Sequence, residues 1–303
     1  MFGKRYRLFS VYGFEIRIDA SWFVLAFLVT WTLAIGFFPA IAPGLSRNTY
    51  WVMGVLGAFG LFGSIVLHEL AHAIVARRND IPMKGITLFI FGGVAEMGAD
   101  PPSAGAELRM AAAGPIASVL IGGILYLLSA ATAAFVPAPA VEVLRYLGWL
   151  NLILAAFNMI PAFPLDGGRI LRAYLWHRRG SLRKATHTSS RVGAAFGLLL
   201  MALGIASFLG GMIVPGIWYF VLGTFLRGLA RSSYQQVLLK EALEGEPVSR
   251  FMKRDPVTVS ADISLRELVE DYVYRHHQKL YPLVEGGELE GCVSVNQLRE
   301  IPR

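Results

Sequence analysis

The chain has 303 residues, of which 55% are hydrophobic and only 16% are charged. Soluble globular proteins carry about 25% charged residues, so this composition excludes an ordinary soluble enzyme and indicates a membrane protein. The net charge of +7 arises from basic residues that flank apolar stretches, which is typical of membrane topology and leads us to expect no nucleic-acid partner. The single cysteine, Cys292, excludes an internal disulfide framework and a thiolate-rich zinc site, so any metal must be held by histidine and carboxylate.

Residues 1–19 alternate apolar and polar side chains and lack the pattern of a signal peptide, so they predict a strand or an interfacial segment. Uncharged or nearly uncharged runs follow, and a helix that crosses the hydrocarbon core needs about 20 such residues. The runs are 20–46, 49–76, 110–136, 146–165 and 192–226. The last would measure about 52 Å as one helix, so Gly210-Gly211 is predicted to divide it into two spans. We therefore predict a polytopic α-helical membrane protein with six transmembrane helices.

The distribution of basic residues predicts the orientation of these spans. With the N-terminus inside, the inside segments up to residue 191 contain 15 lysines and arginines, whereas the outside loops contain only Arg47 and Arg145. Such an excess is typical of cytoplasmic loops. We expect both termini in the cytoplasm, and the chain in a prokaryotic cell membrane.

Residues 85–94 are apolar, β-branched and aromatic, with glycines between them, and they are too short to span a membrane. They predict a re-entrant β-hairpin that dips toward the second span. Non-helical backbone at that depth is tolerated only against protein or a water-filled cavity. An interfacial loop on the surface is the alternative.

The sequence HELAH, residues 68–72, lies inside the second predicted span. His68 and His72 are four residues apart on one helix face and can share a metal ion, while Glu69 beside them can accept a proton from the attacking water. An ionisable residue in a lipid span costs about 2.5–3.5 kcal/mol on insertion scales, so three together indicate a functional site. A polar contact between helices is the alternative.

A catalytic zinc takes three protein ligands plus water, so two histidines leave the site incomplete. The candidates for the third ligand are Glu96, Asp100, Glu107, Asp166, His177 and His187. Asp166 has the best setting, because it ends an apolar span in which Pro161 and Pro164 break the helix and leave room for water. A helix N-cap is its alternative role. Glu96, 24 residues after His72, has the spacing of a soluble zinc hydrolase, whereas His177 and His187 lie among basic residues that predict a solvated loop.

Residues 246–303 are charged and predict a small α/β unit of order β-α-β-β-α. Ser264 opens its first helix, with Glu267 three residues later as a capping box. This pattern resembles one CBS motif. Such motifs normally pair, and the cleft of the pair binds adenine nucleotides, so the resemblance suggests ATP or a related nucleotide and a homodimer through this motif. We divide the chain into a membrane-embedded zinc metalloprotease domain, 1–234, and a single cytoplasmic CBS motif, 246–303.

Four segments together resemble the site-2 protease family of intramembrane zinc metalloproteases over essentially the whole chain. They are the HELAH helix, the Gly-Gly-Val segment at 92–94, the Ala-Gly-Pro segment at 113–115 and the segment from Asn158 to Arg169. The resemblance implies that His68, His72 and Asp166 bind one zinc ion and that Glu69 is the catalytic base. It also implies that Asn158 binds the substrate or polarises its carbonyl, although Met159 stands where the family motif has proline.

The resemblance implies hydrolysis of peptide bonds in or near the transmembrane segments of single-span membrane proteins. A helix hides its carbonyls in its own hydrogen bonds, so the substrate must unwind locally. The hairpin, with Gly92 and Gly93, is expected to pair with the unwound peptide by strand addition. A non-proteolytic zinc or ion transporter is the rival class, but no repeat of paired half-helices is visible and a transporter does not need Glu69.

Overall fold

The computed structural model describes residues 5–89 and 92–299. The chain forms two compact units, Met1–Lys240 and Glu241–Arg303. The described residues include six helices long and apolar enough to cross a membrane, which confirms the predicted number. These are Ser21–Ile41, Arg47–Arg78 (α3), Ala104–Thr132 (α4), Ala138–Asn158 (α5), Leu182–Leu209 (α7) and Ile213–Leu243 (α8).

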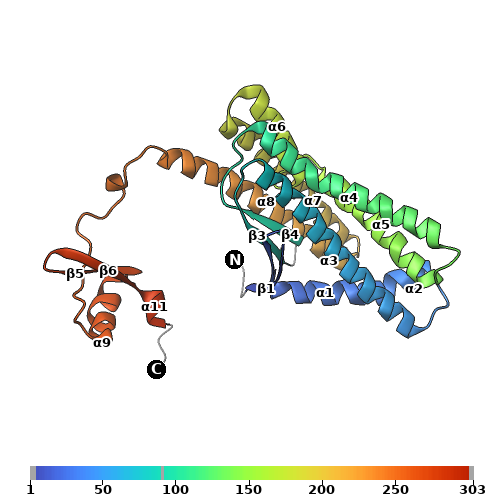
Figure 1. The fold of residues 1–303 in the computed structure, drawn as a ribbon, viewed down its shortest axis with the longest axis horizontal. Coiled ribbons are helices and arrows are strands. Elements are labelled where there is room, and N and C mark those ends of the chain that lie inside the picture. Colours follow the sequence, from blue (N-terminus) through green and yellow to red (C-terminus); the bar gives the residue numbers. More distant parts are fainter. Residues whose placement is uncertain (1–4, 90–91, 300–303) are drawn as a thin grey trace. The chain divides into compact units, whose positions relative to one another are not determined.

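The first span consists of α1 (Ser21–Thr32), a π-helical turn (Leu33–Phe37) and α2 (Phe38–Ile41). The predicted division of the last apolar run is confirmed, because Gly210 caps α7 and Gly211 follows with a φ of +84°, a left-handed conformation that favours glycine. Within the membrane unit, α3, α4 and α5 lie side by side (Figure 1).

The predicted boundaries of the fourth span, 146–165, were wrong. The helix α5 runs over Ala138–Asn158 instead. It begins before the predicted start because Glu142 and Arg145 lie within the helix and form an ion pair at 2.7 Å, one turn apart. The prediction had left both residues out of the span because they are charged. It ends early because the residues before Pro161 disfavour helical backbone.

The membrane unit also contains a four-stranded sheet of order β1-β2-β3-β4. Its strands are β1 (Arg5–Val11), β2 (Phe14–Asp19), β3 (Met83–Phe89) and β4 (Gly92–Met97). The strand predicted near the N-terminus and the hairpin β3–β4 are both confirmed. The parallel pairing of β2 with β3 joins the N-terminal strands and the hairpin into one sheet. The depth of the hairpin in a bilayer stays a prediction.

The sheet packs against the C-terminal part of α3, on the side opposite the two histidines of the HELAH sequence. One buried cluster joins side chains of β2 and β3 to Leu70 and Ala73 of α3. This packing fixes the edge strand β4 beside the C-terminal part of α3, where the candidate site lies.

A buried ion pair attaches α6 (Asp166–Arg179) to α4. Glu107 is 0% exposed and Arg172 is 5% exposed, and Arg172 Nε donates to Glu107 Oε1 at 2.6 Å. The Glu107 carboxylate therefore pairs with an arginine of α6. His177 and His187 lie on helices α6 and α7, so the prediction that they lie in a loop was wrong.

The second unit has the predicted order, with its first strand reduced to a single parallel bridge between Val259 and Leu283. The capping box of Ser264 and Glu267 is confirmed. The elements are a 3-10 turn (Val248–Arg250), α9 (Leu265–Glu267), a π-helical turn (Leu268–Val273), α10 (Tyr274–His276), β5 (Leu280–Glu285), β6 (Glu288–Ser294) and α11 (Val295–Arg299). Its small core is built on Val259, Leu268 and Tyr281.

Replacing Arg172 by alanine is expected to leave the buried Glu107 carboxylate without its cation. Breaking one partner of such a pair costs about 3–5 kcal/mol. Thermal and denaturant unfolding in detergent should show this loss for Arg172→Ala and little change for Arg178→Ala, which removes an exposed arginine from the same helix. Equal stability of the two variants would contradict the structural role given to the pair.

Candidate metal centre and active site

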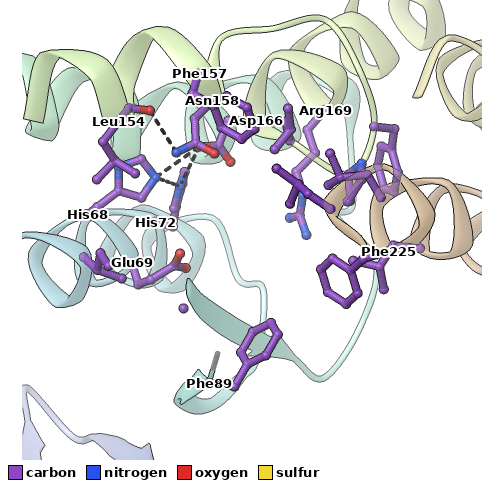
Figure 2. A pocket seen from close by; sticks show the side chains of 18 of the residues that line it. His68, Glu69, His72, Phe89, Leu154, Phe157, Asn158, Asp166, Arg169 and Phe225 are labelled. Carbon is purple, nitrogen blue, oxygen red and sulfur yellow. Dashed lines mark hydrogen bonds and ion pairs between the residues drawn. The ribbon is translucent and has the colours of Figure 1, made fainter. Parts of the chain in front are cut away.

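His68 and His72 of α3 converge on Asp166, the first residue of α6, although 94 residues separate His72 from Asp166. Asp166 Oδ2 lies 3.1 Å from His68 Nε2 and 3.2 Å from His72 Nε2, and the two Nε2 atoms are 3.2 Å apart. Figure 2 shows the three side chains pointing toward one another. The helix N-cap is Leu165, so the alternative role of Asp166 as an N-cap was wrong.

The far side of each imidazole ring is held by α4. His72 Nδ1 donates to the Met110 carbonyl oxygen at 2.7 Å, and His68 Nδ1 lies 2.8 Å from Ser118 Oγ. A carbonyl oxygen can only accept, so the neutral His72 ring carries its proton on Nδ1 and presents a lone pair at Nε2.

This donor set fits a zinc ion. Zinc bonds of about 2.0–2.1 Å in a tetrahedral site put ligand atoms about 3.3 Å apart, close to the three separations. Burial acts to raise the pKa of the Asp166 carboxyl, but its contacts with His68 and His72 outweigh burial and hold that pKa below its usual range. The Asp166 oxygen and the two Nε2 atoms therefore form a compact group of donor atoms that could hold a metal ion.

Gly114 of α4 lies directly against the cluster. A Cβ atom at this position would lie 2.2 Å from His72 Nε2 and 2.6 Å from His68 Nε2. Only glycine allows α4 to come close enough for Met110 and Ser118 to reach the two rings.

Glu69 lies on the same turn of α3 but outside the ligand cluster. Its carboxylate points into the cavity beneath the ligands (Figure 2). A Cβ atom on Gly93 of β4 would lie 2.8 Å from Glu69 Cγ, so glycine allows the strand to touch the base of this side chain. Gly92, its neighbour, pairs with Phe89 at the turn end of the hairpin.

Asn158 ends α5 beside the ligand cluster and lines the same cavity (Figure 2). Its amide Nδ2 donates to the Leu154 carbonyl oxygen at 3.0 Å. Among the described residues this amide has no other hydrogen-bond partner, so its second N–H and its oxygen are free to form further hydrogen bonds.

These residues surround a cavity of about 570 Å³. Its walls come from α3, the β3–β4 hairpin, the α5–α6 connection and α8, and most of the lining is apolar. The charged or titratable lining residues are His68, Glu69, His72, Asp166 and Arg169.

Among the candidate ligands whose side chains the structure describes, only Asp166 joins the two histidines. Asp100 forms an ion pair with Lys240 at 2.7 Å, and Glu107 is paired with Arg172. Glu96 pairs with Gly85 through the backbone of β4, and its side chain lies outside the described residues. Sequence reasoning gave no role to Met110, Ser118 or Arg169, since a backbone carbonyl, a serine in an apolar helix and an arginine in the first turn of α6 carry no spacing signal.

Comparison with known proteins agrees with a membrane-embedded metallohydrolase. The model of peptidase family M50 matches residues 56–137 and 130–200, and the CBS domain model matches residues 248–302. Putative zinc metalloprotease Rip3 of Mycobacterium tuberculosis is 35% identical over 95% of this chain and 74% of its own length. Putative zinc metalloprotease sll0528 of Synechocystis is 34% identical over 98% of this chain and 78% of its own length.

A solved structure, the site-2 protease from Methanocaldococcus jannaschii, is similar with a TM-score of 0.50 and 30% identity, over 76% of this chain and 94% of that chain. The chain therefore belongs to peptidase family M50, the site-2 proteases, and is a zinc metalloprotease that carries a CBS domain. Family membership implies proteolysis within a lipid bilayer, and it decides against the transporter alternative.

Replacing Gly114 by alanine is expected to push the His68 and His72 rings from their positions and weaken zinc binding about 10–100-fold, as loss of ligand support does elsewhere. Gly123→Ala is the matched control, because a Cβ at Gly123 on the same helix meets nothing within 4 Å. Chelator competition on the purified proteins measures the difference. Equal zinc affinity in both variants would contradict the close approach at Gly114.

Proposed function

We propose that this chain hydrolyses peptide bonds in or near the transmembrane segments of single-span membrane proteins. In this proposal His68, His72 and Asp166 hold one zinc ion, and Glu69 is the catalytic base. The observation that carries it is the cluster of three ligand atoms within 3.2 Å of one another, beside a carboxylate in a largely apolar cavity.

The chemistry assigned to each side chain follows from its position. Zinc in such a site supplies a Lewis acid for the scissile carbonyl and lowers the pKa of water. Glu69 accepts the proton of the attacking water and passes it to the leaving nitrogen. In this proposal the second amide N–H of Asn158 donates to a substrate carbonyl.

The substrate enters as extended peptide. We place it along β4, because β4 is the edge strand of the sheet and Gly93 touches Glu69. Backbone pairing with this edge would hold unwound peptide across the cavity, next to Gly92 and Gly93.

We propose that the zinc lies near the cytoplasmic side of the membrane. His72 lies five residues before Arg77, which corresponds to about 8 Å along the helix axis. The excess of basic residues supports cytoplasmic N- and C-termini, so water would reach the site from that side.

Replacing Glu69 by glutamine is expected to keep zinc and abolish cleavage, because the three ligands remain and the base is lost. Metal analysis and a cleavage assay on single-span membrane proteins in detergent or vesicles measure the two effects. Asp166→Ala is the contrasting variant and should lose zinc as well as activity, whereas Glu96→Ala should keep its zinc. A fully active Glu69→Gln protein would refute the mechanism.

We further propose that the CBS motif pairs with a second copy and binds ATP or a related adenine nucleotide at the seam. Support comes from its small core and from apolar side chains that the lone unit leaves on its surface, among them Leu265, 51% exposed, and Leu289, 67% exposed. Nucleotide binding would then shift the population of open and closed membrane domains and gate substrate entry.

The CBS proposal predicts that ATP changes the cleavage rate of the full chain by about fivefold or more. A chain that ends near Leu239 lacks the motif and should not respond. The measurement is the cleavage rate of one substrate by each version, with and without ATP. Equal activity of the two versions with no response to ATP would mean that the motif is not regulatory.

A further inference from the structure

Arg169 lies in the catalytic cavity and has no role in the chemistry described above. It follows Asp166 by one turn of α6, is half-buried and is the only lysine or arginine among the described cavity-lining residues. Figure 2 shows its side chain extending into the cavity between Asp166 and Phe225.

The guanidinium of Arg169 lacks an anionic partner in the described part of the chain. Among the described residues, its one polar contact is the donation from Nη1 to the sulfur of Met97 at 3.6 Å, and a thioether is a weak acceptor for a group with five N–H donors. Arg172, three residues along the same helix, is by contrast paired with Glu107. A partly buried cation without an anion is costly, so the cavity is built to receive one.

The charges of the cavity lead to the same conclusion, given the proposed zinc site. Two positive charges on zinc would be balanced by Asp166 and Glu69, so Arg169 leaves one net positive charge among the described residues of a largely apolar cavity. A carboxylate suits it best, because the two oxygens of a carboxylate match the planar fork of a guanidinium.

The strand β4 indicates where the carboxylate lies on the substrate. Gly93 contacts Glu69 and Met97 contacts Arg169, and these residues are four apart on one face of the same strand. A peptide paired with β4 therefore passes the catalytic base and the arginine about four residues apart, roughly 13 Å.

We propose that Arg169 is a specificity-determining residue that binds an aspartate or glutamate side chain of the substrate, about three to five residues from the scissile bond. This inference rests on the proposed function and adds a substrate preference to it. An apolar membrane segment with one acidic residue near the cut would be preferred over a wholly apolar one.

The test uses fluorescent single-span peptides of leucine and alanine, with one glutamate moved through the central ten positions and a glutamine partner for each. Their binding to the zinc-loaded Glu69→Gln protein in detergent micelles is measured by fluorescence anisotropy, which requires no turnover. At one position or a short cluster, glutamate should bind about tenfold more tightly than glutamine.

Three variants assign this preference to Arg169. Arg169→Gln should abolish the difference between glutamate and glutamine, Arg178→Gln on the exposed face of α6 should retain it, and Arg169→Glu should favour lysine at the same position. Thermal unfolding and zinc content are measured for each variant.

No glutamate preference at any position, or a preference that survives in Arg169→Gln, would overturn the inference. The absence of a glutamate preference is measured without any Arg169 variant, so this outcome does not depend on whether such a variant folds. Wild-type enzyme that cleaves glutamate and glutamine peptides equally would overturn this inference and leave the proposed function intact. Preferential binding of glutamate peptides without cleavage of any substrate would support the acidic-residue preference and contradict the proposed proteolytic function.

Discussion

The membrane unit is organised by one electrostatic constraint, which is that two imidazole lone pairs and a carboxylate face one another in apolar surroundings. The ligand atoms lie 3.1–3.2 Å apart and stay there only because other groups hold the far side of each ring. Met110 and Ser118 of α4 do this for the histidines, and Gly114 makes their approach sterically allowed. The packing of α3 on α4 is therefore as much part of the site as the ligands are.

The position of Asp166, the proposed third ligand, depends on how α6 packs against its neighbours. The Glu107–Arg172 pair holds α6 to α4, and the Arg172 guanidinium stacks over the Phe163 ring in the connection that leads to Asp166. Ser189 of α7 donates to the Gly168 carbonyl oxygen at 3.0 Å, which ties the first turn of α6 to a third helix. Asp166 thus sits on a rigid helix start, although the chain before it is irregular.

The sequence allowed the six spans, the hairpin and the catalytic motif to be predicted, because each depends on local pattern: apolar run length, β-branched residues between glycines, and histidines four apart. The predicted bounds of α5 were wrong, because hydropathy treats Glu142 and Arg145 as two separate charges and does not include their ion pair one turn apart. Sequence reasoning could not find Ser118 or the open guanidinium of Arg169, because both depend on which helices become neighbours. The meeting of Asp166 with the histidines was predicted from its setting and from family resemblance, not from geometry.

The corner between the sheet and the first span has a mechanical consequence. Only Ala20 separates β2 from α1, and Ser21 N donates to Asp19 Oδ1 at 2.9 Å across that corner. A joint this short does not let the strand and the helix change direction independently. Helix tilt responds to the thickness of the surrounding bilayer. Through β2 and β3, a thicker or thinner membrane would therefore turn the edge strand that borders the cavity, so that lipid composition would act mechanically on the geometry of the cavity wall.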